Sequence, residues 1–170
     1  MADNTKAKTT ASKGSFWDQY NNWVMESIVP QLRPYYKNLP HLSSGLKNII
    51  TILIKIGYYI GLALSVLAIL ALPILLLGGI GGIITMVVIV IQLIAYFMSF
   101  SAIKSSTHKG WEYLFSLMTL QIVAELAKFV IQVFTGFSTR SMDVAGILIG
   151  LLGFAIGAYF MFEVESEFKD

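Results

Sequence analysis

The sequence predicts an all-α membrane protein, a four-transmembrane-helix bundle preceded by an amphipathic interfacial helix. Of its 170 residues, 56% are hydrophobic and only 13% are charged, whereas a soluble domain carries about 25% charged residues. Nearly every residue from 56 to 100 is apolar or small. That run is more than twice the roughly 20 residues that one span needs, so we expect a multi-pass integral membrane protein.

The chain divides into four segments of different character. Residues 1–14 are polar and lack the apolar stretch of a secretory signal, so we expect a flexible tail. A targeting segment is the weaker alternative, because Asp3 and the absence of arginine are unlike a transit peptide. Residues 15–42 should form an amphipathic helix and a proline linker, residues 43–163 a four-span membrane domain, and residues 164–170 an acidic tail.

The amphipathic helix should begin at Ser15, because Ser15 and Asp18 have the S-x-x-D spacing of a capping box. At 100° per residue, its apolar side carries Phe16, Trp17, Tyr20, Trp23, Val24 and Ile28. This aromatic face suits the lipid headgroup level, and packing on a partner or on the ends of the spans is the alternative. Pro30, Pro34 and Pro40 then predict an extended linker.

Four apolar stretches fit membrane spans. The first should be capped by Ser43 or Ser44, bury about residues 57–77 in hydrocarbon and bend at Pro73. The sequence G-G-I-G-G at residues 78–82 predicts a hairpin turn, and the other spans should cover about residues 83–103, up to 135, and 144–162. Lys55, Tyr58 and Trp111 should lie at the membrane interface, where lysine can snorkel and aromatic rings anchor.

The distribution of basic residues predicts the orientation. Four spans place both termini on one side of the membrane, and that side holds nine lysines and arginines, whereas the opposite side holds Arg140 alone. The nine are Lys6, Lys8, Lys13, Arg33, Lys37, Lys47, Lys104, Lys109 and Lys169. Because basic residues are enriched on the cytoplasmic side, we expect both termini to be cytoplasmic.

The third span carries a polar stripe that a lipid-facing helix would not have. Its members are spaced 4, 3 and 4 residues apart: Gln121, Glu125, Lys128 and Gln132. A charge at the bilayer centre costs at least about 2.5–3.5 kcal/mol, so the stripe should face other helices or a wet cavity. Glu125 and Lys128 can pair at i, i+3. Gln92 belongs to a second stripe, with Thr85, Tyr96 and Ser99, and should lie within reach of Gln121 or Glu125.

Glycines recur at helix-packing spacing in two spans. The fourth span has Gly146, Gly150, Gly153 and Gly157, and the first has the weaker pair Gly57 and Gly61. Small residues at this spacing let transmembrane helices approach closely. Such a glycine zipper predicts packing inside one bundle, and homodimerisation is the sharper alternative.

Known catalytic patterns are absent from the sequence. It has no cysteine, no H-E-x-x-H and no G-x-S-x-G, and its two histidines, His41 and His108, lie outside the spans. We therefore expect no enzyme, no metal and no cofactor, and the lack of a basic, aromatic-interleaved face argues against nucleic acid. The expected function is that of a structural or accessory membrane protein, with the bilayer and a protein partner or second copy as contacts. The alternative is a small channel or carrier that uses the intramembrane Glu/Lys/Gln cluster.

The second half of the chain also resembles a type of small bacterial four-helix membrane protein. The resemblance rests on K-G-W-E-Y-L-F at the start of the third span and G-A-Y-F-M-F-E-V-E-S-E-F at the end of the fourth. The chain departs from that pattern by carrying glutamates where basic residues would follow the last span. The resemblance implies a four-span topology and no assigned activity or site.

Overall fold

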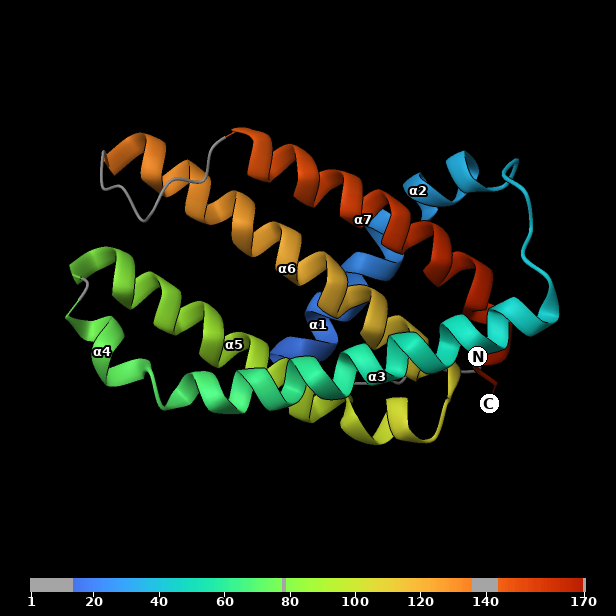
Figure 1. The fold of residues 1–170 in the computed structure, drawn as a ribbon, viewed down its shortest axis with the longest axis horizontal. Coiled ribbons are helices and arrows are strands. Elements are labelled where there is room, and N and C mark those ends of the chain that lie inside the picture. The colour runs from blue at the N-terminus through green and yellow to red at the C-terminus, as the bar shows by residue number, and fades with distance from the viewer. Residues whose placement is uncertain (1–13, 78, 136–143, 170) are drawn as a thin grey trace, which may run out of the picture.

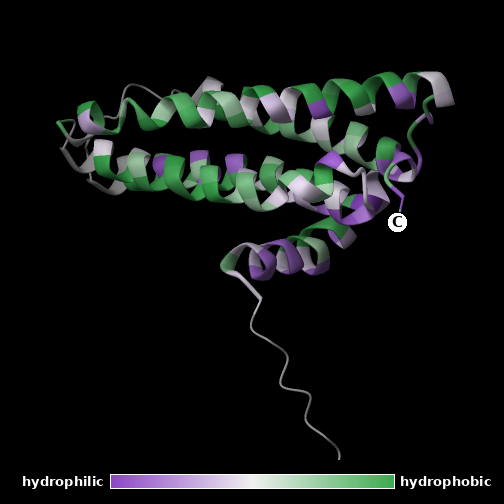
Figure 2. Cartoon of the chain, turned by 90° about the horizontal axis from the view of Figure 1, so that it is seen from below, coloured by the Kyte–Doolittle hydropathy of each residue, from purple (hydrophilic) through white to green (hydrophobic). Residues whose placement is uncertain are grey.

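The computed structural model describes residues 14–77, 79–135 and 144–169. Every regular element among them is helical, and four helices are long and apolar enough to cross a membrane. These are α3 (Ser44–Ile69), α5 (Gly79–Lys104), α6 (His108–Thr135) and α7 (Val144–Val164). Figure 2 shows hydrophobic residues along the four long helices. The prediction of an all-helical chain with four helices able to span a membrane is confirmed at this level.

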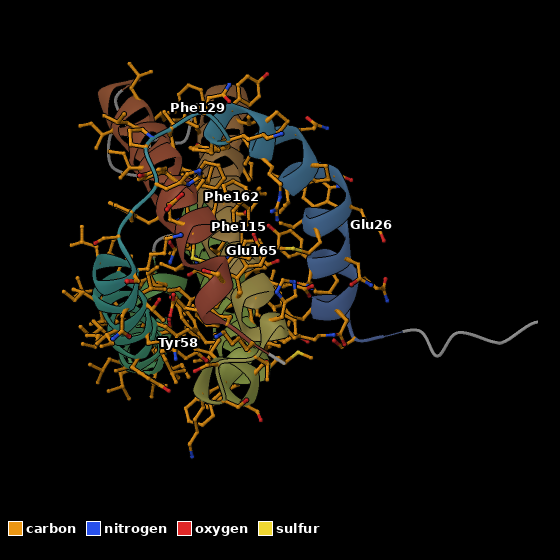
Figure 3. All side chains as sticks on the ribbon, turned by 90° about the vertical axis from the view of Figure 1, so that its right-hand side faces the viewer. Glu26, Tyr58, Phe115, Phe129, Phe162 and Glu165 are labelled. Atoms are coloured by element: carbon orange, nitrogen blue, oxygen red, sulfur yellow. The ribbon has the colours of Figure 1, made fainter. Side chains whose placement is uncertain are left out.

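The four long helices pack in a closed order, α3 on α5, α5 on α6, α6 on α7 and α7 on α3. Their buried side chains gather at one end of the bundle. That end holds the α5–α6 turn and the last turn of α7 (Figure 1). We call this the packed end. Trp111, Phe115 and Phe162 form its centre, with the Phe115 and Phe162 ring centroids 5.4 Å apart (Figure 3). Large aromatic rings contribute large buried areas to the core at this end.

The α5–α6 turn is built on two special backbone positions. Ser106 has a positive φ of 56°, and a Cβ on Gly110 would lie 2.5 Å from the Ala102 carbonyl oxygen. Only glycine allows such a close approach of α6 to the end of α5. The turn is also tied to the C-terminus, because the Lys169 amide donates to the Ser106 carbonyl at 3.0 Å.

The first span ends earlier than its apolar run suggests. α3 stops at Ile69, and a separate short helix, α4 (Leu72–Leu76), carries Pro73 in its first turn. The expectation of one bent span over residues 57–77 was therefore wrong, because proline at the start of a helix favours a fresh N-terminus. The expected glycine hairpin also differs, since α5 already begins at Gly79. Gly82 fits against the Leu75 carbonyl, where a Cβ would overlap it.

The N-terminal part of the chain is a three-piece helix. It consists of α1 (Phe16–Trp23), the π-helical segment η1 (Val24–Ile28) and α2 (Val29–Tyr36). We call residues 16–36 the arm. The predicted cap at its start is confirmed, because Ser15 Oγ accepts from the Asp18 amide at 3.1 Å.

The prediction of an extended proline linker was wrong for residues 30–36, which are helical. Pro30 is the second residue of α2 and follows directly on the π-helical segment, so its missing N–H falls where the two windings join. The π-helical segment before Pro30 is wider than an α-helix, so the proline ring avoids a clash with the carbonyl groups of the preceding turn. Pro34 is accommodated inside α2, and only residues 37–43 connect the arm to α3 without a helix.

The arm lies across the bundle rather than along it (Figures 1 and 3). It contacts α6 through α1 and η1, and α7 through α2. Glu26 points away from the four long helices in Figure 3. After α7, the 3₁₀ turn η2 (Glu165–Glu167) returns the chain toward α3 at the same end.

Candidate functional site

The arm is held to the bundle by buried polar contacts. Asn21 is fully buried, its amide nitrogen donates to Glu112 Oε2 at 3.2 Å, and its amide oxygen accepts from Ser116 Oγ at 2.7 Å. Trp17 is 2% exposed, and its indole Nε1 donates to Ser99 Oγ at 3.1 Å. Because the nitrogen and the oxygen of the Asn21 amide are both paired by α6, this contact sets one register of the arm on the bundle.

A charged contact reinforces the start of the arm. Asp18 accepts from the Tyr113 hydroxyl at 2.7 Å and from Ser15 Oγ at 2.8 Å, and Lys109 Nζ lies 3.7 Å from it. The hydrogen bond from Tyr113, followed by that from Ser15, holds the pKa of Asp18 below its ordinary value, and Lys109 adds to this effect. Asp18 is therefore a docking residue, although it lies outside the apolar face that the sequence predicts for this helix.

The other end of the arm is attached to α7 and to the turn that follows it. Arg33 pairs with Glu165 at 3.0 Å, and its guanidinium lies 5.3 Å from the centre of the Phe162 ring. The Tyr36 hydroxyl donates to the Ala155 carbonyl at 3.0 Å. These contacts bring α2 against the side of the last span.

Glu163 ties the segment after the arm to the last span. It is 7% exposed and receives the Leu42 amide at 2.8 Å, with His41 Nδ1 at 2.7 Å and Lys47 Nζ at 3.3 Å. The Tyr159 hydroxyl also donates to the Pro40 carbonyl, at 2.5 Å. A buried carboxylate of this kind is stable only because its oxygens are paired.

The residues expected at the membrane interface divide into two groups. Trp17, Tyr58 and Trp111 are buried in protein, at 2%, 4% and 1% exposure, so their rings pack on the chain itself, and their depth at the membrane interface stays a prediction. Protein and lipid are both apolar surroundings for a ring, and each ring polar group finds a partner inside the protein. The indole of Trp111 donates to the Met161 carbonyl at 2.6 Å, and the Tyr58 hydroxyl donates to the Tyr96 carbonyl at 2.5 Å.

The remaining interface residues stay accessible to different degrees. Phe16 and Trp23 are exposed, at 69% and 49%. Tyr20 is half-buried and stacks on Trp17 with ring centroids 5.5 Å apart. Lys55 is half-buried, donates to Ser106 Oγ and lies 5.3 Å from the centre of the Phe168 ring. The arm therefore turns a mixed face to the bundle and keeps two large aromatic rings outside.

The polar stripe of α6 borders a pocket away from the packed end. Glu125 and Lys128 form the ion pair that their spacing predicts, with Lys128 Nζ 2.9 Å from Glu125 Oε1. Gln121 donates to the Tyr96 hydroxyl at 3.5 Å and is itself exposed. The backbone of Gln132 continues α6, whereas its side chain lies outside the described part of the structure.

The pocket lies between α5, α6 and α7 and has a volume of about 450 Å³. It brings Gln92 of α5 together with Gln121 and Glu125 of α6, beside Met118, Ile122, Gly150, Gly153 and Phe154. A neighbouring cavity of about 270 Å³ shares Met118 and Gln121 and reaches Tyr58 and Tyr96 nearer the packed end. Three polar side chains from two helices thus meet in one hollow, as the two stripes predicted.

The glycines of the predicted zipper play different parts. Gly61 and Gly157 each pack closely against a side chain of a neighbouring helix. A Cβ on Gly61 would overlap the Tyr96 hydroxyl, and a Cβ on Gly157 would lie 2.7 Å from Met118 Sδ. An added Cβ at Gly57 or Gly153 would meet no heavy atom within 4 Å, and at Gly150 it would make only an ordinary contact of 3.9 Å with Ile122. Gly146 lines a smaller pocket with Gly150. Within one chain, therefore, only part of the zipper brings helices together.

Sequence reasoning missed Asn21, Ser116 and Glu163 as contact residues. It placed Ser99 in a polar stripe but did not find its partner, Trp17. Ser99 and Ser116 are small polar residues within spans, and both are fully buried, which is a signal for a polar partner. Among the described residues, no group of three His, Asp or Glu side chains is arranged to hold a metal ion.

Comparison with known proteins adds no assignment to this geometry. The chain matches no protein-family model, and neither a curated protein nor a solved structure is significantly similar to it.

Proposed function

We propose that this protein is a non-enzymatic structural or accessory protein of a membrane, acting through helix–helix contacts and through lipid or a protein partner. The observation that carries the proposal is the docked arm. It is fastened to α6 by buried polar contacts and to α7 by an exposed hydrogen bond, and yet it leaves Phe16, Trp23 and Tyr35 exposed. A firmly positioned element with free aromatic rings is suited to contact something outside the chain.

The depth of the arm supports a position at the membrane interface. It contacts α6 around Ser116, five residues beyond Trp111, which is about 7–8 Å along a helix. Amphipathic helices lie at a similar depth, about 5–10 Å into the boundary between headgroups and acyl chains. In this proposal the packed end and both termini face the cytoplasm, because basic residues concentrate there.

Site-specific photo-crosslinking from the exposed rings tests the accessory role. A photoreactive amino acid replaces Phe16 or Trp23 in cells, and the same residue at buried Trp17 serves as the matched control. Adducts with one discrete protein, or with phospholipid, are expected from Phe16 and Trp23 and not from Trp17. If the two exposed positions give no adduct beyond the Trp17 background, the proposal fails.

A small channel or carrier is the second candidate, favoured by the pocket that Gln92, Gln121 and Glu125 line. Ionisable residues within spans often mark pathways for ions or substrates. Flux into reconstituted vesicles, measured with the original chain and with Glu125→Gln, separates the two candidates. Transport requires flux that the substitution abolishes, whereas the accessory role requires no flux in either case.

A further inference from the structure

We propose that the pocket between α5, α6 and α7 binds a small, neutral, amphipathic molecule that carries a hydroxyl or another single hydrogen-bond donor. Its donor would reach the polar wall made by Gln92, Gln121 and Glu125, and its apolar body would lie against Met118, Ile122 and Phe154. Such a site does not depend on the accessory role, and it could equally serve a protein that carries or senses a membrane-dissolved compound.

The polar wall offers acceptors that are not yet used. Lys128 occupies Oε1 of Glu125, but Oε2 is buried and accepts no hydrogen bond from any described residue. Gln121 uses its amide nitrogen toward the Tyr96 hydroxyl, which leaves its amide oxygen available. A buried acceptor without a partner costs free energy. Because Oε2 has almost no exposed surface, the Glu125 carboxylate has to turn toward the pocket to meet a donor, and a ligand that donates a hydrogen bond favours this turn by pairing the oxygen.

The charge of the wall selects a neutral donor rather than a cation. Glu125 and Lys128 already compensate each other at 2.9 Å. A cationic ligand would therefore bring one uncompensated charge into the membrane interior, which is costly, and would lie close to the Lys128 ammonium. A neutral hydroxyl satisfies Oε2 without adding charge.

The apolar walls and the size of the pocket determine the rest of the ligand. The pocket volume of about 450 Å³ lies in the usual range for small-molecule pockets. Gly150 and Gly153 leave the α7 wall open, and a Cβ on Gly153 would meet no heavy atom within 4 Å. Met118 and Phe154 can contact a ring or a short alkyl chain. A phenol or alcohol with a modest hydrocarbon body fits these features.

Competitive photolabelling of the full chain in lipid nanodiscs tests this site. The probe is a 4-alkylphenol with a photoreactive diazirine in its alkyl chain, and labelled peptides are identified by mass spectrometry. The competitors are the unlabelled 4-alkylphenol, its methyl ether, which has no donor, and a matched alkylbenzylammonium. We expect saturable labelling near Met118, Ile122 or Phe154, and competition by the phenol about five- to tenfold stronger than by the ether, the effect of one hydrogen bond.

Two variants of α7 serve as a matched pair. Gly153→Leu should fill the pocket and reduce saturable labelling at least tenfold, while Leu152→Phe, which adds bulk on the exposed outer face, should leave it unchanged. Equal competition by phenol and ether, or stronger competition by the ammonium, would overturn the proposal. Non-saturable labelling would overturn it too. Should Gly153→Leu fail to fold, the three competitors on the original chain still decide the outcome.

Discussion

At the scale of single residues, polar side chains determine where the arm and the spans meet. Asn21 shows this most directly, because a neutral amide at zero exposure bonds both Glu112 and Ser116 of α6. A polar group buried in this way stabilises little in net terms, but it is costly to leave without its partner. Such residues therefore specify one arrangement among several apolar alternatives.

The neighbouring asparagines allow this role to be measured. Asn21→Ala should destabilise the docked arm by about 1–3 kcal/mol, since it strands the Ser116 hydroxyl and the Glu112 carboxylate. Asn22→Ala, at the adjacent exposed position, should change stability by less than about 0.5 kcal/mol. Thermal unfolding in mild detergent and limited proteolysis of the arm are the measurements. Equal effects of the two substitutions would contradict the docking role.

The Glu125–Lys128 pair gives a second prediction for single residues. Lys128→Met alone should destabilise the protein, because it leaves Glu125 without its cation. The loss should be smaller than the roughly 3–5 kcal/mol expected for a fully buried pair, since the Glu125 side chain is 41% exposed. The double change of Glu125→Gln and Lys128→Met should be milder, because no charge is stranded. Unfolding of all three chains in the same detergent tests this order. A double variant less stable than Lys128→Met would contradict it.

At the scale of elements, the arm is a helix that changes its winding to reach two different surfaces. Its α-helical start contacts α6, the π segment before Pro30 changes the winding of the helix, and α2 contacts α7. The whole arm is therefore held at both ends, by Asp18 and Asn21 on one side and by Arg33 and Tyr36 on the other.

Docking of the start of the arm should depend on pH. The pKa of Asp18 is lower in the docked state than its ordinary value near 4. Its contribution is therefore complete above about pH 4 and is lost as the pH falls through the lowered pKa of the docked state. Hydrogen exchange of α1 between pH 3 and pH 6 should show faster opening at the acidic end. Asp18→Asn should remove this dependence, and an unchanged pH profile in that variant would exclude Asp18 as its cause.

The α5–α6 turn should tolerate no side chain at Gly110. Gly110→Ala would place a Cβ 2.5 Å from the Ala102 carbonyl oxygen, and the backbone on both sides would have to move. We expect a loss of at least about 1–3 kcal/mol, comparable to other strained core positions. Gly57→Ala is the control, because its Cβ would meet no atom within 4 Å. Unfolding midpoints that fall equally in both variants would show that the close approach is unimportant.

At the scale of the whole molecule, packing is uneven along the bundle. The buried core gathers at the packed end, and the pockets lined by Glu125 lie beyond it. Only 6% of the first candidate span is buried inside the chain, against 33% of the third. Lipid, a ligand or a second chain therefore contributes more of the surroundings of α3 than of α6.

The proposed topology can be checked on the intact protein. A single cysteine at Ser105, in the α5–α6 turn, should be labelled from the cytoplasmic side by an impermeant reagent, and one at Ser138 from the opposite side. The native chain has no cysteine, so it provides an unlabelled background. Labelling of both positions from one side would contradict the four-span arrangement.

The sequence by itself determined the features that depend on local spacing. An apolar run long enough for a bilayer must be helical to satisfy its backbone, so the number of spans followed from composition. The Ser15 cap and the Glu125–Lys128 pair join residues three positions apart. They are contacts within one helix or at its start, which periodicity describes directly.

Only the tertiary structure decided which side chains face protein and which face lipid. From the sequence, Trp17, Tyr58 and Trp111 resemble interface anchors, because the protein interior and the membrane interface both offer apolar surroundings to a ring. The two differ only in whether protein or water supplies the hydrogen-bond partner. That partner comes from far along the chain, 82 residues away for the Trp17–Ser99 bond and 50 for Trp111–Met161. Local periodicity carries no information about such contacts, so the docked arm and the polar pocket became visible only once the helices were assembled.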